Sequence, residues 1–184
     1  MKLVDIHEGI ESTLLILQHR LKANTARPAI EIIKEYGNFP KVECYAGQLN
    51  QVFMNLLGNA IDALEDYNNH SSNEIEISFR PKTIRISTSV NSDTVTIRIA
   101  DNGMGINQEV IHKLFDPFFT TEPVGKGTGL GLSISYQIIV EKHRGKLQCI
   151  SAPGEGAEFV IEIPLSQEVS ALAAENTKEI VISQ

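Results

Sequence analysis

The sequence predicts an α+β fold, a two-layer sandwich of helices packed on a sheet. Helical and strand patterns are mixed along the chain without the regular strand–helix–strand alternation of a parallel α/β fold. The chain has 184 residues and a hydrophobic content of 42%, which suits one globular domain with a single core. We expect this domain to cover residues 1–165, and residues 166–184 to form a C-terminal tail outside the fold, for which disorder is one alternative.

The N-terminal half predicts a helix, two strands and a second helix. Apolar residues recur at helical spacing from Asp5 to Lys22. The runs "RPAIEIIKEYG" and "KVECYA" are rich in strand-forming residues, and the first is bounded by proline and glycine, so both are expected to be strands. A continuous apolar stripe predicts a long helix from about Ala46 to Asp66, and the turn-forming residues of "YNNHSSNE" should end it.

The C-terminal half predicts two hairpins separated by helices and a glycine-rich segment. Two alternating runs flank "NSD" in "TIRISTSVNSDTVTIRIAD", which is the pattern of a hairpin half buried in a sheet. A short helix is expected over "NQEVIHKLF", followed by glycine-rich chain to about Gly129. The next segment, "LGLSISYQIIVEKHRG", predicts a helix that ends at Gly145. Finally, "KLQCISAPGEGAEFVIEIPL" predicts two strands joined by a glycine-containing turn.

Composition excludes several classes of function. The 16 basic and 23 acidic residues give a net charge of −7 without basic clusters, which argues against binding to nucleic acid or to an anionic membrane. Cys44 and Cys149 lack the spacing of zinc ligands and are expected to be small buried side chains. No stretch is apolar enough to cross a bilayer, and the N-terminus lacks the pattern of a signal peptide. These features predict a soluble, cytoplasmic domain.

Glycines are concentrated around the predicted helix that ends at Gly145. Glycine is favoured where the backbone needs a positive φ or approaches a ligand closely. The segment "GTGLGLSIS" leads into that helix, whose first N–H groups could bind phosphate, although a flexible surface loop is the alternative. Neither a Walker loop nor GxGxxG is present, so a nucleotide would need another kind of fold. The glycines concerned are Gly103, Gly105, Gly125, Gly127, Gly129 and Gly131.

Three polar residues share one face of the long second helix. Asn55, Asn59 and Asp62 are spaced i, i+4 and i+7. They could simply face water, but asparagine is a poor helix former, and two of them in mid-helix suggest use as oxygen ligands. Magnesium prefers oxygen ligands and bridges phosphates to one or two protein groups.

Asp101 lies where a predicted strand ends and "NGMG" begins. An Asp-Asn-Gly turn would explain it without any function. Alternatively, its carboxylate accepts a hydrogen bond from the exocyclic amine of a base. Such a contact would select adenine, because guanine carries a carbonyl group there and would leave a buried charge unpaired.

Four segments together resemble sensor histidine kinases. They are "NLLGNAIDAL" (Asn55 to Leu64), "DNGMGI" (Asp101 to Ile106), "FDPFF" (Phe115 to Phe119) and "GKGTGLGLS" (Gly125 to Ser133), in the order and spacing of the N, G1, F and G2 boxes of that family. The resemblance covers roughly residues 4–165. It places the chain in a wider group of ATPases that includes DNA gyrase. It implies a Bergerat-type sandwich, with a mixed sheet of about five strands on about three helices and a mobile lid over ATP.

The resemblance also implies the roles of individual residues. Asn59 corresponds to the magnesium ligand, and Asn55, one turn earlier, to a second residue of the catalytic site. Asp101 corresponds to the adenine-selecting carboxylate. The aromatic residues Phe115, Phe118 and Phe119 are expected to anchor the lid by burying aromatic surface. The full set expected to bind ATP and Mg²⁺ is Asn59, Asp62, Asp101, Gly103, Gly105, Ile106, Lys126, Gly127, Thr128, Gly129, Leu130 and Gly131.

The chemistry implied is phosphoryl transfer. Hydrolytic relatives carry a glutamate general base at the position of Asn55, and an amide cannot accept a proton from water at neutral pH. The resemblance therefore implies that ATP is held for transfer to a protein histidine, mainly by positioning and charge neutralisation. Two residues depart from the family pattern: Glu122 stands where a lysine is common, and Ala157 replaces a threonine that supports a water near the adenine.

The phosphoacceptor is missing from the sequence. Such kinases phosphorylate a histidine in an H box resembling "HELRTP", and none of the five histidines has that context. We expect all five to be solvated: His7, His19, His70, His112 and His143. The expected partners are a histidine-containing dimerisation domain, in a longer parent or in a separate chain, and indirectly a response regulator. Two alternatives are a nucleotide-sensing or scaffold module without transfer activity and a serine-directed kinase of the anti-sigma-factor type.

Overall fold

The fold was determined from a computed structural model, which describes residues 1–23, 28–70, 81–120 and 128–166, with side chains omitted at 67–70. The elements follow one another in an α+β order. They are β1 (Lys2–Val4), α1 (Ile6–Leu21), β2 (Ile30–Tyr36), β3 (Val42–Cys44), α2 (Ala46–His70), β4 (Lys82–Asn91), β5 (Thr94–Asp101), α3 (Gln108–Ile111), α4 (Gly131–Tyr136), the π-helical η2 (Gln137–Lys142), β6 (Lys146–Ser151) and β7 (Ala157–Pro164).

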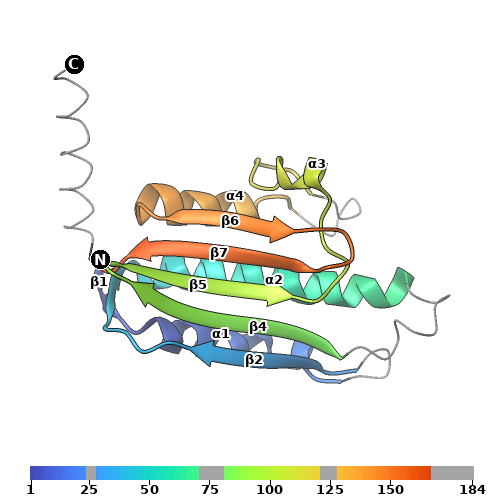
Figure 1. Cartoon of the computed structure of the whole chain (residues 1–184), viewed down its shortest axis with the longest axis horizontal. Coiled ribbons are helices and arrows are strands. Elements are labelled where there is room, and N and C mark those ends of the chain that lie inside the picture. The colour runs from blue at the N-terminus through green and yellow to red at the C-terminus, as the bar shows by residue number, and fades with distance from the viewer. Residues whose placement is uncertain (24–27, 71–80, 121–127, 167–184) are drawn as a thin grey trace, which may run out of the picture.

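The predicted two-layer sandwich is confirmed. Five strands form one sheet in the order β2-β4-β5-β7-β6. The sheet is mixed, because β2 runs parallel to β4 while the other neighbours are antiparallel. Helices α1, α2 and α4 lie together behind the sheet in Figure 1, and no described helix covers the face toward the viewer. The predicted β4–β5 and β6–β7 hairpins are both present.

The core lies between the helices and the inner face of the sheet. Every second residue is buried in β4 as far as Thr88 and throughout β5, as the alternating sequence predicts. These residues meet the apolar stripe of α2, in which Phe53, Leu56 and Leu57 are fully buried. Burial of each such side chain contributes roughly 1.5–3 kcal/mol. Because the apolar face of α2 packs on the sheet, its polar face points away from the sheet and its side chains can contact other parts of the molecule.

A second, two-stranded sheet joins the two ends of the described chain. Strand β1 pairs antiparallel with β3. The backbone N–H of Glu43 in β3 donates to the carbonyl oxygen of Leu165, just after β7, at 2.9 Å. The sequence does not predict β1, because three residues are too few to show an alternating pattern.

Three helices differ from their predicted form. Helix α2 continues to His70, beyond the expected end at Asp66; asparagine and histidine cost only about 0.7 kcal/mol each relative to alanine in a helix, so they need not end one. The predicted helix over "LGLSISYQIIVEKHRG" is present, but its second half, η2, has the wider π-helical turn. Helix α3 is shorter than predicted and ends at Ile111.

His143 is fully buried, so the prediction that it is solvated is wrong. Its Nδ1 lies 2.8 Å from the carbonyl oxygen of Ile138, and its Nε2 accepts a hydrogen bond from the backbone N–H of Tyr45 at 3.0 Å. A carbonyl can only accept and an N–H can only donate, so the ring is neutral with its hydrogen on Nδ1. Burial lowers the pKa of His143 below its usual value. The imidazole thereby ties the end of η2 to the start of α2.

Among the other histidines, His7 is also not solvated as predicted. It is half-buried and stacks on Tyr36 with ring centroids 4.5 Å apart. His19 and His112 are exposed, as predicted. The side chain of His70 lies outside the described residues.

Acid should destabilise the domain through His143. A second ring hydrogen would point at the Tyr45 N–H, so the folded pKa lies below the unfolded one. The stabilisation is therefore present above the unfolded pKa of about 6.5 and is lost as pH falls through the folded pKa. Urea unfolding of the parent and of His143→Gln between about pH 5 and 8 should show this loss in the parent only.

The comparison isolates His143 because every other group titrates in both proteins. His112→Gln, at an exposed site, is the matched control and should keep the pH dependence of the parent. Equal slopes for His143→Gln and the parent would contradict the neutral buried imidazole.

Candidate functional site

One cavity gathers most of the residues that the sequence singles out. It has a volume of 490 Å³ and is bounded by α2, the end of β5, the turn after it and the start of α4. This volume lies within the usual range for small-molecule sites. The predicted residues that line it are Asn55, Asn59, Asp62, Asp101, Gly105, Ile106, Thr128, Gly129 and Gly131.

Helix α2 supplies the amide groups of the cavity. Asn55 and Asn59 lie one turn apart on the face that does not pack on the sheet. Asn55 Nδ2 donates to the carbonyl oxygen of Gly131 at 2.9 Å and to Ser135 Oγ at 3.1 Å. Asn55 therefore fastens α2 to α4, while Asn59 makes no side-chain hydrogen bond to any residue that the structure describes.

Asp62 lines the cavity, but part of its carboxylate is already engaged. Arg20 Nη2, from the last turn of α1, lies 2.6 Å from Asp62 Oδ1 and 2.6 Å from Glu65 Oε2. All three side chains are roughly one third exposed, so the pair contributes little to stability. It does place a positive charge beside an acidic side of the cavity, and the sequence did not predict this role for Arg20.

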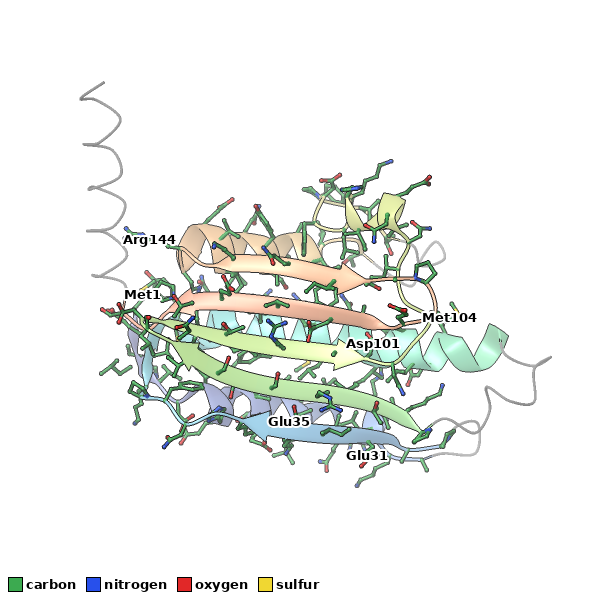
Figure 2. All side chains as sticks on the ribbon, in the orientation of Figure 1. Met1, Glu31, Glu35, Asp101, Met104 and Arg144 are labelled. Carbon is green, nitrogen blue, oxygen red and sulfur yellow. The ribbon has the colours of Figure 1, made fainter. Side chains whose placement is uncertain are left out.

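Asp101, the last residue of β5, is a buried carboxylate that also lines the cavity. Figure 2 shows it at the end of β5, with Met104 in the turn beyond. The backbone N–H of Gly103 donates to Asp101 Oδ1 at 2.8 Å. Burial raises the pKa of Asp101 to about 6, and hydrogen bonds from the backbone N–H groups of Gly103 and Ala157 oppose this shift. At neutral pH the side chain is therefore mostly ionised and can accept a further hydrogen bond.

Two glycines of the cavity cannot be replaced without a backbone shift. Gly105 has a φ of 73°, and a Cβ there would lie 1.9 Å from the carbonyl oxygen of Ala152. Gly129 has a φ of 64°, and its Cβ would lie 2.5 Å from the carbonyl carbon of Phe118. Both positions therefore require glycine for conformation and space.

Gly131 differs, because a Cβ there would lie 3.5 Å from Asn55 Cγ, an ordinary contact. Glycine at this position keeps space open beside the Asn55 amide. Such space is what close approach of a phosphate to the backbone needs, so the residues present fit the expected ligand.

The remaining predicted residues fall outside the lining or outside the described chain. Gly103 acts through its N–H on Asp101. Leu130 precedes α4, and its carbonyl oxygen accepts from the N–H of Ile134 at 2.9 Å, away from the lining. Lys126, Gly127 and Glu122 lie outside the described residues.

The aromatic cluster only partly matches its prediction. Phe118 is 75% exposed, so the prediction that it buries aromatic surface is wrong. Its φ is 65°, and its N–H donates to the carbonyl oxygen of Gly129 at 2.9 Å. Phe115 packs against Tyr136 with ring centroids 5.4 Å apart, and Phe119 lines the cavity.

Most of the remaining lining of the cavity is apolar, and the sequence singles out only Phe119 and Ala157 of it. Strand alternation could have suggested Phe159, which lies two residues from Ala157 and so on the same face of β7. The others depend on how separate elements pack. The additional lining residues are Ala63, Asp66, Met104, Leu114, Phe119, Thr120, Leu132, Ala157 and Phe159.

The donor set limits which metals could bind. Within the described part of the chain, no three His, Cys, Asp or Glu side chains are grouped to hold a metal ion. The side-chain oxygens that α2 offers to the cavity are those of two amides, Asn55 and Asn59, and two carboxylates, Asp62 and Asp66. This suits Mg²⁺, which keeps waters and phosphate oxygens as most of its ligands, better than a metal held by protein alone. No described helix is long and apolar enough to cross a membrane.

Sequence comparison places the chain in a known family. Residues 45–167 match the family described as "Histidine kinase-, DNA gyrase B-, and HSP90-like ATPase". The chain is 31% identical over 158 residues to sporulation kinase E of Bacillus subtilis, covering 86% of this chain and 19% of that protein. It is 35% identical over 167 residues to the signal transduction histidine-protein kinase AtoS of Escherichia coli, covering 90% and 24%. The chain thus spans about a quarter or less of these relatives.

Solved structures show the same fold. The nucleotide-free catalytic domain of histidine kinase ThkA superposes with a TM-score of 0.72 at 28% identity, covering 91% of this chain and 99% of that one. ThkA in complex with the response regulator protein TrrA gives a TM-score of 0.67 at 26% identity, covering 91% and 42%. The chain therefore belongs to the histidine kinase-, DNA gyrase B- and HSP90-like ATPase family, as a catalytic, ATP-binding domain of the sensor histidine kinase type.

Proposed function

We propose that this domain binds Mg²⁺-ATP in the described cavity and transfers its γ-phosphoryl group to a histidine on a separate dimerisation domain. The observation that carries the proposal is the pairing of a buried carboxylate, Asp101, with the amide face of Asn55 and Asn59 in one cavity. Base recognition and metal binding then lie at its two ends. Family membership supports ATP as the nucleotide.

At the base end, Asp101 accepts a hydrogen bond from the adenine amino group. Gly103 holds the carboxylate through its N–H group. The apolar side chains of Met104, Ile106 and Phe159 line the same cavity and exclude water from that bond. Guanine would leave the carboxylate unpaired, which supports selection of adenine.

At the phosphate end, Asn59 supplies a metal ligand and Asn55 a second amide. When bound, ATP would supply the transferable phosphoryl group, and Mg²⁺ would neutralise the negative charge of the phosphates. Asn55 cannot act as a general base toward water, so this position favours transfer over hydrolysis. The chain's contribution is to orient and enclose the phosphates, for which the open space at Gly131 is suited.

The acceptor and the partners belong to the rest of the signalling system. No described histidine lines the cavity, which supports an acceptor on another domain. The ThkA structure in complex with TrrA supports a response regulator as the indirect partner. We also propose a cytoplasmic location and a domain unit of residues 1–165, with 166–184 as a tail.

A transfer assay tests the function. The domain, Mg²⁺ and γ-labelled ATP are incubated with a dimerisation-domain protein and, as control, with its His→Gln variant. We expect acid-labile label on the histidine-containing partner only. Acid-stable label would indicate a serine-directed kinase, and ATP binding without any transfer would indicate a sensing module. Either result would refute the proposed reaction.

A further inference from the structure

A buried hydroxyl of α4 lies beside the cavity without lining it. Ser135 is 0% exposed, and its Oγ donates to the carbonyl oxygen of Gly131, one turn earlier, at 2.8 Å. Asn55 Nδ2 lies 2.9 Å from that carbonyl oxygen and 3.1 Å from Ser135 Oγ. The three atoms therefore form a closed triangle that joins α2 to α4.

The triangle fixes which end of the Asn55 amide faces α4. The Gly131 carbonyl can only accept a hydrogen bond. The Ser135 hydroxyl has directed its single hydrogen to that carbonyl, so toward Asn55 it presents only lone pairs. Two acceptors on one side require the amide to present its nitrogen. The orientation thus follows from chemistry and does not depend on how the two ends of an amide were assigned.

The opposite end of the amide remains available to the cavity. Asn55 lines the cavity, and its Oδ1 has no hydrogen-bond donor among residues 1–23, 28–70, 81–120 and 128–166. An amide free to rotate about its last bond would offer N–H and oxygen in turn, and an N–H would repel a metal ion. A fixed oxygen is preorganised for a cation or a metal-bound water.

We propose that Ser135 is a positioning residue that holds the Asn55 amide with Oδ1 toward the cavity. The part that concerns Mg²⁺-ATP rests on the proposed function, whereas the orientation itself does not. A hydroxyl that bonds the carbonyl four residues earlier is common in helices and can be merely structural. The contact with Asn55 distinguishes the two roles, because only a positioning residue alters the state of that amide when it is removed.

The chain offers a matched control in the same helix. Ser133 is also buried, and its Oγ donates to the carbonyl oxygen of Leu130 at 3.0 Å, but it has no hydrogen bond to Asn55. Ser135→Ala and Ser133→Ala each remove one buried hydroxyl and one hydroxyl-to-backbone bond. Only the first removes an acceptor from Asn55.

The first measurement is made without nucleotide. The side-chain NH₂ signals of Asn55 in an ¹⁵N–¹H NMR spectrum are assigned by their loss in Asn55→Ala. We expect Ser135→Ala to shift these signals and to speed exchange of their hydrogens by about 5-fold, equivalent to one neutral hydrogen bond of about 1 kcal/mol. Ser133→Ala should leave them unchanged. Unchanged signals in Ser135→Ala, or equal changes in both variants, would overturn the proposal.

The second measurement separates this proposal from the function. We expect Ser135→Ala to weaken ATP binding about 5-fold in Mg²⁺ and to leave adenosine binding unchanged, because adenosine has no phosphates. A parent that binds no ATP would refute the proposed function while the amide signals still decide the role of Ser135. Equal loss of adenosine and ATP binding in Ser135→Ala would overturn the positioning role.

Discussion

Asn59→Ala is expected to abolish Mg²⁺-dependent ATP binding, with a loss of affinity of about 100-fold or more, as removal of a direct metal ligand would give. The variant should remain folded, because the Asn59 side chain has no hydrogen bond to any described residue and alanine favours an interior helical position. Isothermal titration with ATP, in the presence and absence of Mg²⁺, measures the effect. Binding without Mg²⁺ should be similar in the parent and the variant.

The matched control is Asn50→Ala. Asn50 lies on the same helix, is exposed and is outside the cavity lining, so its replacement should not change binding. If Asn59→Ala binds Mg²⁺-ATP like the parent, Asn59 is not the metal ligand and the proposed metal end of the cavity is wrong.

Asp101→Asn is expected to remove the preference for adenine and to lower ATP affinity about 100-fold. An amide can present its N–H groups to the base, so the carboxylate's requirement for a donor is lost. Titration of parent and variant with ATP and with GTP measures the selectivity. An unchanged ratio of the two affinities would contradict base recognition by Asp101.

Asp101→Asn should raise the free energy of unfolding at neutral pH, although it weakens ATP binding. The pKa of Asp101 is raised from 3.8 to about 6, so its folded form favours the proton. The contribution of the protonated Asp101 carboxyl to the free energy of unfolding is complete below the unfolded pKa and is lost as pH rises through the folded pKa. This loss amounts to roughly 3 kcal/mol at neutral pH by the conversion of about 1.4 kcal/mol per pKa unit.

Asp101→Asn cannot ionise and should escape that loss. In thermal unfolding without nucleotide, the Tm of the variant should therefore exceed that of the parent by a margin that grows from about pH 4 to 7. Asp93→Asn, at an exposed site at the far end of the β4–β5 hairpin, should follow the parent. Parallel curves for the parent and Asp101→Asn would show that burial of the carboxylate imposes no cost on the fold.

Local periodicity explains why much of the site could be predicted. The spacing of Asn55, Asn59 and Asp62 places them on one helical face whatever the rest of the chain does, and all three line the cavity. The position of Asp101 at a strand end follows from the alternating pattern before it. The order of the four motifs then indicated which pocket these residues share.

Contacts between distant elements explain the rest. The pairing of Arg20 with Asp62 depends on how α1 packs against α2, and no local pattern encodes it. His143 is buried because the start of α2 offers an N–H to its ring. The π-helical turns of η2 likewise have no signature in "QIIVEK", since periodicity distinguishes helix from strand more readily than one helical pitch from another.

The small sheet of β1 and β3 has a mechanical consequence. Strand β3 is hydrogen-bonded to β1 on one side and to Leu165 on the other, and it leads within two residues into α2. Figure 1 shows this junction at the end of the sheet away from the C-terminal end of β5. Helix α2 has 25 residues and so a length of about 38 Å. Because β3 leads into α2, a pulling force applied at either end of the described chain would reach the N-terminal end of this helix, which carries Asn55 and Asn59.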